Sequence, residues 1–310
     1  MSGQPRILTI AVLTYRRPRD LRAVLPLLVE QAASVMPLGI DARVLVIDND
    51  PDASARDLVT GHEGVVYVHE PTPGIAAARN RALTESAGSD LLAFIDDDER
   101  PSPGWLAALV GLLEKRQAAA VVGPVVSSYD AEPDAWITAG RFFRRRSLAT
   151  GAVIDVAATN NLLLDLAVVR LFRLDFDVSL GITGGEDTLF TRTLVLRGGL
   201  MLWCAEAVVT DVVPVARLTR EWVLQRAFSS GNGWSVTSVM LASGWARLRT
   251  RLRLTGIGAV RVAGGLGRIG VGAITRSTAQ NARGSRTLAR GAGMVSGAWG
   301  HRYGEYARAR

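Results

Sequence analysis

The stretch from Asp90 to Arg100 constrains the fold of this chain most, because an apolar run ends there in four consecutive acidic residues. The run Leu91 to Ile95 is too short for an ordinary helix, and Pro101 and Pro103 interrupt regular structure soon after it. We therefore expect a buried strand that delivers the carboxylates of Asp96 to Glu99 to a loop.

Carboxylates that stand this close together repel one another unless a cation or a hydrogen-bonding ligand offsets the repulsion. Hard divalent cations take oxygen ligands, and Mg²⁺ or Mn²⁺ typically uses one or two carboxylates together with substrate phosphates. The loop thus predicts a site for a metal ion and a diphosphate. Taken alone, it fits a solvated acidic turn equally well.

Composition limits the class of protein. The chain has 310 residues, of which 48% are hydrophobic, so it can bury one large core with or without an appendage. Its one cysteine, Cys204, excludes an intramolecular disulfide framework, and with three histidines it leaves too few soft ligands for a zinc site. A reducing cytosol is the expected setting. No uncharged apolar run reaches the length of a membrane span, so we expect no transmembrane helix.

Charge is distributed unevenly along the chain. Residues 245–310 contain 13 arginines and one acidic residue, whereas residues 1–244 contain 23 basic and 28 acidic residues. This contrast predicts a boundary near Ser243 and Gly244. We expect a catalytic domain over residues 1–243 and an arginine- and glycine-rich helical region over residues 244–310.

The first hundred residues alternate between apolar runs and helical patterns. Strands are expected at residues 7–13, 44–47, 65–69 and 91–95, with helices at residues 20–31 and after Gly74. This alternation predicts an α/β fold with a doubly wound sheet. Ligands bind such sheets at the carboxyl ends of the strands, which here carry Thr14, Asp48, Glu70 and the acidic loop.

The second half adds a strand at residues 121–124, a strand at 158–164 edged by Asn160, and a further strand at 201–209. Glycines at residues 181–185 allow Glu186 and Asp187 to begin a helix. Acidic residues at a helix start are common as simple capping groups, which is the alternative to a functional role for this pair.

Five short motifs occur in the order that they have in family 2 glycosyltransferases, and the resemblance covers about residues 5 to 235. They are Thr14 to Pro18, Val46 to Asn49, Gly74 to Leu83, Phe94 to Glu99, and Gly184 to Thr188. The chain resembles an inverting enzyme of this family. The resemblance implies a GT-A fold, which is a Rossmann-like, doubly wound mixed sheet, here with a basic helical C-terminal extension.

The resemblance also implies a donor site for a nucleoside-diphosphate sugar. Within it Asp48 would bind the base, Arg79 would lie beside the nucleotide, and Asp96 would approach the ribose. Asp98 would bind Mn²⁺ or Mg²⁺ on the diphosphate. The full set of residues expected to bind the nucleotide is Thr14, Tyr15, Arg16, Asp48, Arg79, Asp96 and Asp97.

Asp187 resembles the general base of the family, the group that takes the proton of the acceptor hydroxyl. The acceptor side is expected to include Asn160, Gly185, Glu186 and Trp222. Core packing is the alternative for Trp222. One departure concerns the position where family members often carry a histidine, because this chain has Asp211 there. Asp211 is therefore expected to be a second metal ligand, or else a surface loop residue.

The arginine-rich region begins with a basic amphipathic pattern. Trp245, Leu248 and Leu252 share one helical face, and the remaining positions carry arginines at 247, 249, 251 and 253. Such helices suit anionic membrane surfaces. A solvated helix packed on the catalytic domain is the alternative, and nucleic-acid binding is a weaker third, since no nucleic-acid module is recognisable.

These observations predict a metal-dependent glycosyltransferase of polysaccharide biosynthesis that uses a nucleotide sugar. Its acceptor would be a carbohydrate, a lipid-linked glycan or a small molecule. It would be cytoplasmic, peripheral at the inner face of the cell membrane, with no nucleic-acid partner. The alternative is an inactive nucleotide-binding or membrane-scaffolding protein of the same fold. Retention of both Asp98 and Asp187 favours the enzyme.

Overall fold

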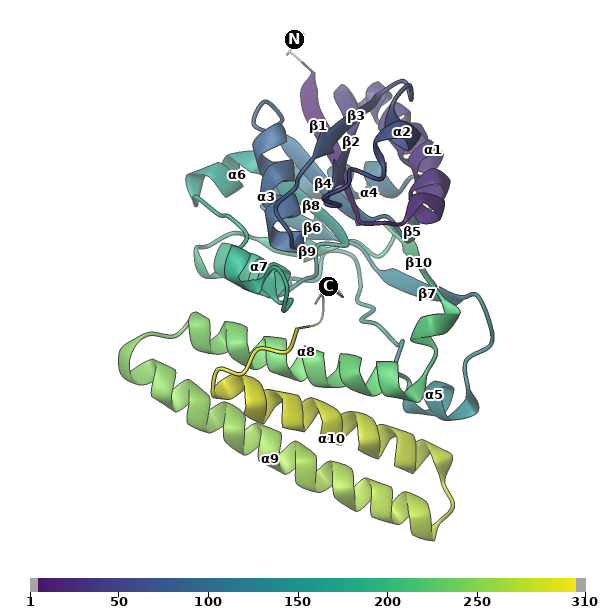
Figure 1. Ribbon diagram of the computed structural model, residues 1–310. Helices are drawn as coiled ribbons and strands as arrows, with labels where there is room; N and C mark the ends of the chain where they lie inside the picture. The colour runs from purple at the N-terminus through teal and green to yellow at the C-terminus, as the bar shows by residue number, and fades with distance from the viewer. Residues whose placement is uncertain (1–4, 305–310) are drawn as a thin grey trace. The chain divides into compact units, whose positions relative to one another are not determined.

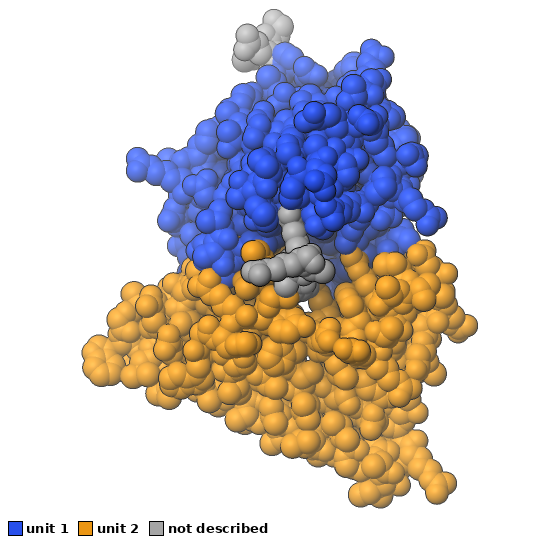
Figure 2. All heavy atoms as spheres, in the orientation of Figure 1, with its two compact units in different colours: residues 1–126, 145–181, 190–212 blue, residues 127–144, 182–189, 213–310 orange. Residues whose placement is uncertain are grey.

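The computed structural model describes residues 5–304 and divides into two compact units (Figure 2). The first unit, the sheet unit, comprises residues 1–126, 145–181 and 190–212. The second, the helical unit, comprises residues 127–144, 182–189 and 213–310.

A seven-stranded mixed sheet forms the centre of the sheet unit, with the order β3-β2-β1-β4-β8-β6-β9 (Figure 1). Strand β8 runs antiparallel to both of its neighbours, while the β1–β2, β1–β4, β2–β3 and β6–β9 pairs are parallel. The strands are β1 (Arg6–Thr14), β2 (Ile40–Asp48), β3 (Val65–His69), β4 (Leu91–Asp96), β6 (Ala120–Val122), β8 (Asn161–Asp165) and β9 (Met201–Trp203). The predicted doubly wound α/β fold is confirmed.

Helices cover both faces of this sheet because its strands are apolar on both sides. Helices α1 (Pro18–Ser34) and α4 (Trp105–Arg116) bury one apolar cluster, and α3 (Ile75–Glu85) and α6 (Leu166–Leu171) bury the other (Figure 1). Helix α1 begins at Pro18, a residue suited to the first turn because its missing N–H has no helical partner there. Helix α3 follows Gly74, whose φ of 119° is a conformation that L side chains rarely adopt.

The single strand expected at residues 201–209 is wrong in its extent. Strand β9 ends at Trp203, and a separate strand, β10 (Val209–Val213), begins six residues later. Strand β10 pairs with β5 (Glu99–Pro101) in a smaller sheet of order β5-β10-β7, where β7 is Val125–Tyr129. Asp211 therefore lies within a strand and is only 5% exposed, which excludes the surface loop considered for it.

Further elements connect these strands and helices. They are α2 (Arg56–Val59), α5 (Ala135–Gly140), α7 (Glu186–Leu196) and three 3-10 turns at Met36–Leu38, Val178–Leu180 and Val215–Arg217.

Three long helices make up most of the helical unit: α8 (Arg220–Met240), α9 (Gly244–Ile274) and α10 (Thr278–Ala298). Helix α10 packs extensively against both α8 and α9 (Figure 1). Glycines make this approach possible. A Cβ on Gly291 would lie 2.7 Å from the carbonyl oxygen of Gly258 in α9, and one on Gly293 would lie 2.0 Å from that of Phe228 in α8.

The division into units differs from the boundary expected near Gly244. Helix α8 was assigned to the catalytic domain from the sequence, yet it packs with α9 and α10 in one unit. Helix α8 continues unbroken from Arg220 to Met240, so Trp222 lies in its first turn. That the catalytic domain ends at residue 243 stays a prediction.

Two described segments are long and apolar enough to cross a membrane by length and composition alone, although none was expected. They are Pro18–Leu38 and Gly244–Ile274, and the apolar 18-residue window within each is 39% and 17% buried, respectively. A core helix of a soluble protein passes the same test, and α1 contributes Leu21 and Leu25 to the core. Helix α9 is different, since most of it is exposed.

Candidate functional site

The strand ends of the sheet unit bring polar residues to one edge. In the strand register Thr14 pairs with Asp48, and Leu13 pairs with Asp96. The Thr14 hydroxyl donates to the Asp97 carboxylate over 2.8 Å, which ties the end of β1 to the acidic loop after β4. The expected convergence of these residues is therefore present within the unit.

Asp48 is fully buried and its carboxylate is engaged by the protein itself. It accepts hydrogen bonds from the backbone N–H groups of Asp50 (3.0 Å) and Ala55 (2.8 Å) and from the Tyr67 hydroxyl (3.0 Å). These contacts shape the loop that follows β2. The expected contact of Asp48 with the nucleobase stays a prediction, and the observed bonds give the side chain a role in holding this loop.

The two adjacent arginines after β1 serve different carboxylates. Arg16 has a φ of 54° and its Nε donates to Asp50 over 3.1 Å. Arg17 instead donates from one nitrogen to Asp97 and to Asp98, over 2.9 Å in each case. Sequence reasoning selected Arg16 and missed Arg17. The sequence offered one indication of Arg17, because it stands next to Arg16 in the motif that ends at Pro18.

The acidic loop is an electrostatically strained cluster. Burial raises the pKa of Asp96 to about 6, and the charge of Asp98 adds to the effect. Burial likewise raises the pKa of Asp97 to about 7 and holds the pKa of Glu99 well above its usual range. Although burial opposes it, the charges of Asp97 and Asp98 raise the pKa of Arg17. Positive charge near the loop, such as that of Arg17, therefore favours the ionised form of these carboxyl groups.

Three side chains from other elements complete this cluster. Arg79 is 5% exposed, lies over the Phe176 ring at 5.6 Å, and acts on Asp96 electrostatically. Asn160 donates to the Glu99 carboxylate over 2.6 Å. Arg145 donates to one oxygen of Asp211. Glu99 belongs to the acidic loop expected from the sequence but was given no individual role, and Arg145, which lies in a run of three arginines, was not expected as a site residue.

Asp211 and Asp98 offer oxygen ligands close to one another. Asp211 lies opposite Glu99 in the strand register, and the Val212 N–H donates to the Asp98 carbonyl over 3.1 Å. The Asp211 Oδ1 atom is buried and makes no hydrogen bond within residues 5–304. Those residues contain no ready-made group of three or more metal-ligating side chains. Because Mg²⁺ and Mn²⁺ use one or two carboxylates and complete their shell with phosphates, Asp98 and Asp211 fit such an ion.

Tyr15 lies in the sheet unit, where the Arg16 guanidinium is 5.5 Å from the centroid of its ring. Gly185, Glu186, Asp187 and Trp222 lie in the helical unit. Gly184 and Gly185 have φ values of 79° and 94°, and they lead directly into α7. Glu186 is buried, and Asp187 accepts the Thr188 N–H over 2.6 Å. These positions match the expected helix start. Trp222 stacks on Phe143 with ring centroids 6.0 Å apart, so packing accounts for its position.

Comparisons with known proteins bear on both the sequence and the fold. The sequence profile described as glycosyl transferase family 2 matches residues 9–170. The chain is 37% identical over 236 residues to the succinoglycan biosynthesis protein ExoM of Rhizobium meliloti (strain 1021), covering 74% of this chain and 75% of that protein. It is 32% identical over 140 residues to a pre-mycofactocin glycosyltransferase of Mycobacterium tuberculosis (strain ATCC 25618 / H37Rv), covering 41% of this chain but 29% of that protein.

Solved structures share the fold at low identity. The structure of S. aureus TarS 1–349 matches with a TM-score of 0.52 and 12% identity, covering 79% of this chain and 68% of that one. The structure of GalNAc-T7 with UDP, GalNAc and Mn²⁺ matches with a TM-score of 0.53 and 11% identity, covering 79% of this chain and 52% of that one. The expected GT-A fold is confirmed.

Proposed function

Because the chain belongs to glycosyl transferase family 2, we propose that it moves a sugar from a nucleoside-diphosphate sugar to a hydroxyl group, with inversion at the anomeric carbon. A role in glycosyl transfer follows from the family. What we propose beyond the family is that the donor is a nucleotide sugar, that the reaction uses a divalent cation, and that it inverts the anomeric carbon. The acceptor is a carbohydrate or a lipid-linked glycan, and the similarity to a succinoglycan biosynthesis protein supports a role in polysaccharide biosynthesis.

The observation that carries the proposal is the cluster of buried carboxylates at the strand ends. Asp98 is 8% exposed, Asp211 is 5% exposed, and Asp211 Oδ1 has no hydrogen-bond partner in the described chain. Burying several carboxylates is costly unless positive charge balances them. Arg17 pairs with Asp97 and Asp98, and Arg145 pairs with one oxygen of Asp211, which leaves Asp211 Oδ1 as an open acceptor in the described chain. We assign Asp98 and Asp211 to hold Mn²⁺ or Mg²⁺. A bound ion of this kind supplies Lewis-acid stabilisation of the leaving diphosphate.

The chain's own residues divide the remaining work. Thr14, Tyr15 and Arg16 follow β1 and are assigned to the nucleoside, with Asp96 toward the ribose. Arg79 lies within electrostatic reach of Asp96 and adds a fixed positive charge beside the nucleotide. Asp187 is assigned to take the proton of the acceptor hydroxyl, a contribution of typically about 10²- to 10⁴-fold. One base and a direct in-line attack produce inversion without a covalent sugar–enzyme intermediate.

Asp98→Asn tests the assignment, because it keeps the size of the side chain and removes the charge of the ligand. We expect loss of Mn²⁺-dependent donor binding and of transfer, with the fold retained. Binding is measured as protection of the protein against heat by a panel of sugar nucleotides, with and without Mn²⁺. Asp41→Asn is the matched control, since Asp41 is an exposed carboxylate in β2. Full activity of Asp98→Asn, or of the unchanged protein in chelator, contradicts the metal assignment.

The alternative function is a nucleotide-binding or membrane-scaffolding protein that keeps the fold and lacks turnover. The same panel distinguishes the two. Protection by a sugar nucleotide without hydrolysis or transfer of the sugar, with any acceptor offered, favours the inactive protein. Release of nucleoside diphosphate at a rate that depends on acceptor favours the enzyme.

We further propose that the protein works at the cytoplasmic face of the membrane. Exposed apolar side chains along α9 support this setting: Trp245, Leu248, Leu252, Val260, Leu266, Val271 and Ile274. Arginines stand between them, and basic residues near an anionic leaflet contribute about 1 kcal/mol each. Binding to anionic vesicles that weakens as salt is raised supports this setting. Equal binding to neutral vesicles at low salt contradicts it.

A further inference from the structure

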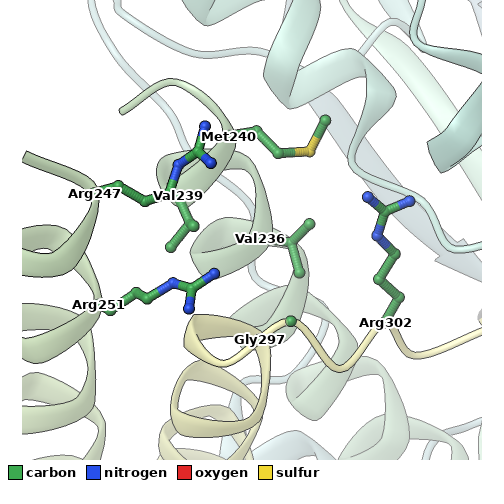
Figure 3. A pocket seen from close by; sticks show the side chains of 8 residues that line it. Val236, Val239, Met240, Arg247, Arg251, Gly297 and Arg302 are labelled. Atoms are coloured by element: carbon green, nitrogen blue, oxygen red, sulfur yellow. The ribbon is translucent and has the colours of Figure 1, made fainter. Parts of the chain in front are cut away.

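A pocket of about 210 Å³ lies within the helical unit (Figure 3). Helix α8 contributes an apolar wall of Val236, Val239 and Met240, and three arginines surround the space. Arg247 and Arg251 extend from α9 on one side and Arg302 from the C-terminal segment on the other, with Val236 between them (Figure 3). The lining residues of this described pocket include no acidic side chain. The side chains that line it therefore carry positive charge only.

Arg251 is positioned by an aromatic ring, but one of its hydrogen-bond donors has no acceptor in the described chain. Its guanidinium lies 5.7 Å from the centroid of the Trp299 ring, and the Trp299 indole N–H donates to the Thr255 hydroxyl over 3.0 Å. Its Nε atom is buried and has no hydrogen-bond partner among residues 5–304. A buried donor left unpaired is costly, and the cost is larger for a charged group. The site is thus short of an acceptor.

The other two arginines are positioned by the backbone around them. Arg247 Nε donates to the Ala242 carbonyl over 3.0 Å, across the turn between α8 and α9. Arg302 lies between His301 and Tyr303, and the buried side-chain amide of Asn232 bonds the backbone of both. Asn232 donates to the His301 carbonyl over 2.9 Å and accepts the Tyr303 N–H over 3.2 Å. The segment that carries Arg302 is therefore attached to α8 on both sides of this residue.

We propose that this pocket binds the phosphate group of an anionic membrane lipid. Guanidinium groups match phosphate oxygens in geometry and charge, and arginine is favoured wherever bidentate recognition of phosphate is needed. The apolar wall of α8 fits the part of a lipid next to its phosphate, which inorganic phosphate lacks. The same turns of α9 also expose Trp245 (81%), Leu248 (41%) and Leu252 (57%), which suits a helix that lies in a membrane interface. The proposal rests on the membrane setting proposed above and does not require turnover.

The test uses the full-length chain and three probes: dihexanoyl phosphatidic acid below its micellar concentration, dihexanoyl phosphatidylcholine, and inorganic phosphate. Binding is measured by calorimetry and by intrinsic tryptophan fluorescence, since Trp299 lies beside Arg251. The pocket variant is Arg247→Gln with Arg251→Gln. Its matched control is Arg249→Gln with Arg253→Gln, which removes the same charge from the same turns of α9 at exposed positions outside the pocket.

We expect phosphatidic acid to bind more tightly than inorganic phosphate, and phosphatidylcholine to bind least. The pocket variant should weaken binding of phosphatidic acid at least about tenfold, as loss of charged hydrogen bonds requires, and the control variant less than about twofold. Arg302→Gln, which changes no helix, should weaken it in the same direction and provides a second test if the α9 variant fails to fold.

Three results would overturn the proposal. They are no binding of phosphatidic acid, equal binding of inorganic phosphate, and an equal loss in the pocket and control variants, which would indicate a general effect of positive charge. Hydrolysis of sugar nucleotides and transfer of the sugar to the acceptors offered are measured in parallel. Lipid binding with neither hydrolysis nor transfer leaves the pocket assignment standing and favours the inactive protein over the glycosyltransferase.

Discussion

Gly264 and Gly265 are neighbours in α9, yet alanine is expected to have opposite effects at the two positions. A Cβ on Gly264 would meet no described atom within 4 Å, whereas one on Gly265 would lie 2.7 Å from Leu288 N and 2.8 Å from the Gly284 carbonyl oxygen. Both substitutions gain about 0.8–1.0 kcal/mol of helix propensity. Only the second pushes into the backbone of α10, and such overpacking typically costs about 1–3 kcal/mol.

The expected magnitudes follow from these two contributions. Gly264→Ala should stabilise the protein by about 1 kcal/mol, and Gly265→Ala should change its stability by between about 0 and about 2 kcal/mol of destabilisation. Because the propensity gain is common to both variants, the difference between their free energies of unfolding measures the overpacking alone, about 1–3 kcal/mol.

The assay is denaturant unfolding followed by far-ultraviolet circular dichroism, with the unfolding of each variant compared at a fixed protein concentration. Gly256 and Gly258 form a second pair, since a Cβ on Gly256 would meet no described atom within 4 Å and one on Gly258 would lie 2.8 Å from the Gly291 carbonyl oxygen. Equal stabilities of Gly264→Ala and Gly265→Ala would refute the close packing of α9 on α10. A more stable Gly265→Ala would refute it as well.

Three further predictions concern single side chains. Asp187→Asn should retain donor affinity and reduce transfer at least about 10²-fold, whereas loss of donor binding alone would direct attention to Glu186 as the base. Arg17→Gln removes the guanidinium that bonds both Asp97 and Asp98, so Mn²⁺ should raise the melting temperature of this variant more than that of the unchanged protein. Arg16→Gln is the control, because Arg16 bonds Asp50 instead. An equal effect of Mn²⁺ on Arg17→Gln and on the unchanged protein contradicts the reasoning. Burial raises the pKa of Cys204 to about 11, so at pH 8 its reactive thiolate should be scarce and a maleimide should label it much faster after unfolding; rapid labelling of the native protein would contradict this.

Local patterns in the sequence were sufficient to predict the strands and helices of the sheet unit and the edge of the sheet at which the candidate site lies. Apolar runs separated by helical patterns identify parallel strands, and the carboxyl ends of such strands meet at one edge whatever the details of packing. The acidic loop after β4 and the polar end of β1 could therefore be placed together from the sequence alone. The ordered motifs also identified the family, because three of them combine a strand end with specific polar residues and the other two lead into a helix.

Choices between neighbouring residues needed the structure. Arg16 and Arg17 are equivalent in a sequence pattern, but the left-handed backbone at Arg16 directs it to Asp50 and leaves Arg17 to bridge Asp97 and Asp98. The break between β9 and β10 was equally hidden, because the residues on both sides of it are apolar. Asp211 consequently becomes a buried strand residue opposite Glu99.

The helical unit shows most clearly what only tertiary contacts decide. The sequence indicates long, glycine-rich, basic helices after residue 243, and it indicates the amphipathic face that contains Leu248 and Leu252. It does not indicate which glycine meets which backbone, because a periodic pattern describes one helix and a close approach depends on two. The pocket has the same origin: Arg251 and Arg302 are far apart in the sequence, and the Asn232 amide in α8 attaches the segment that carries Arg302.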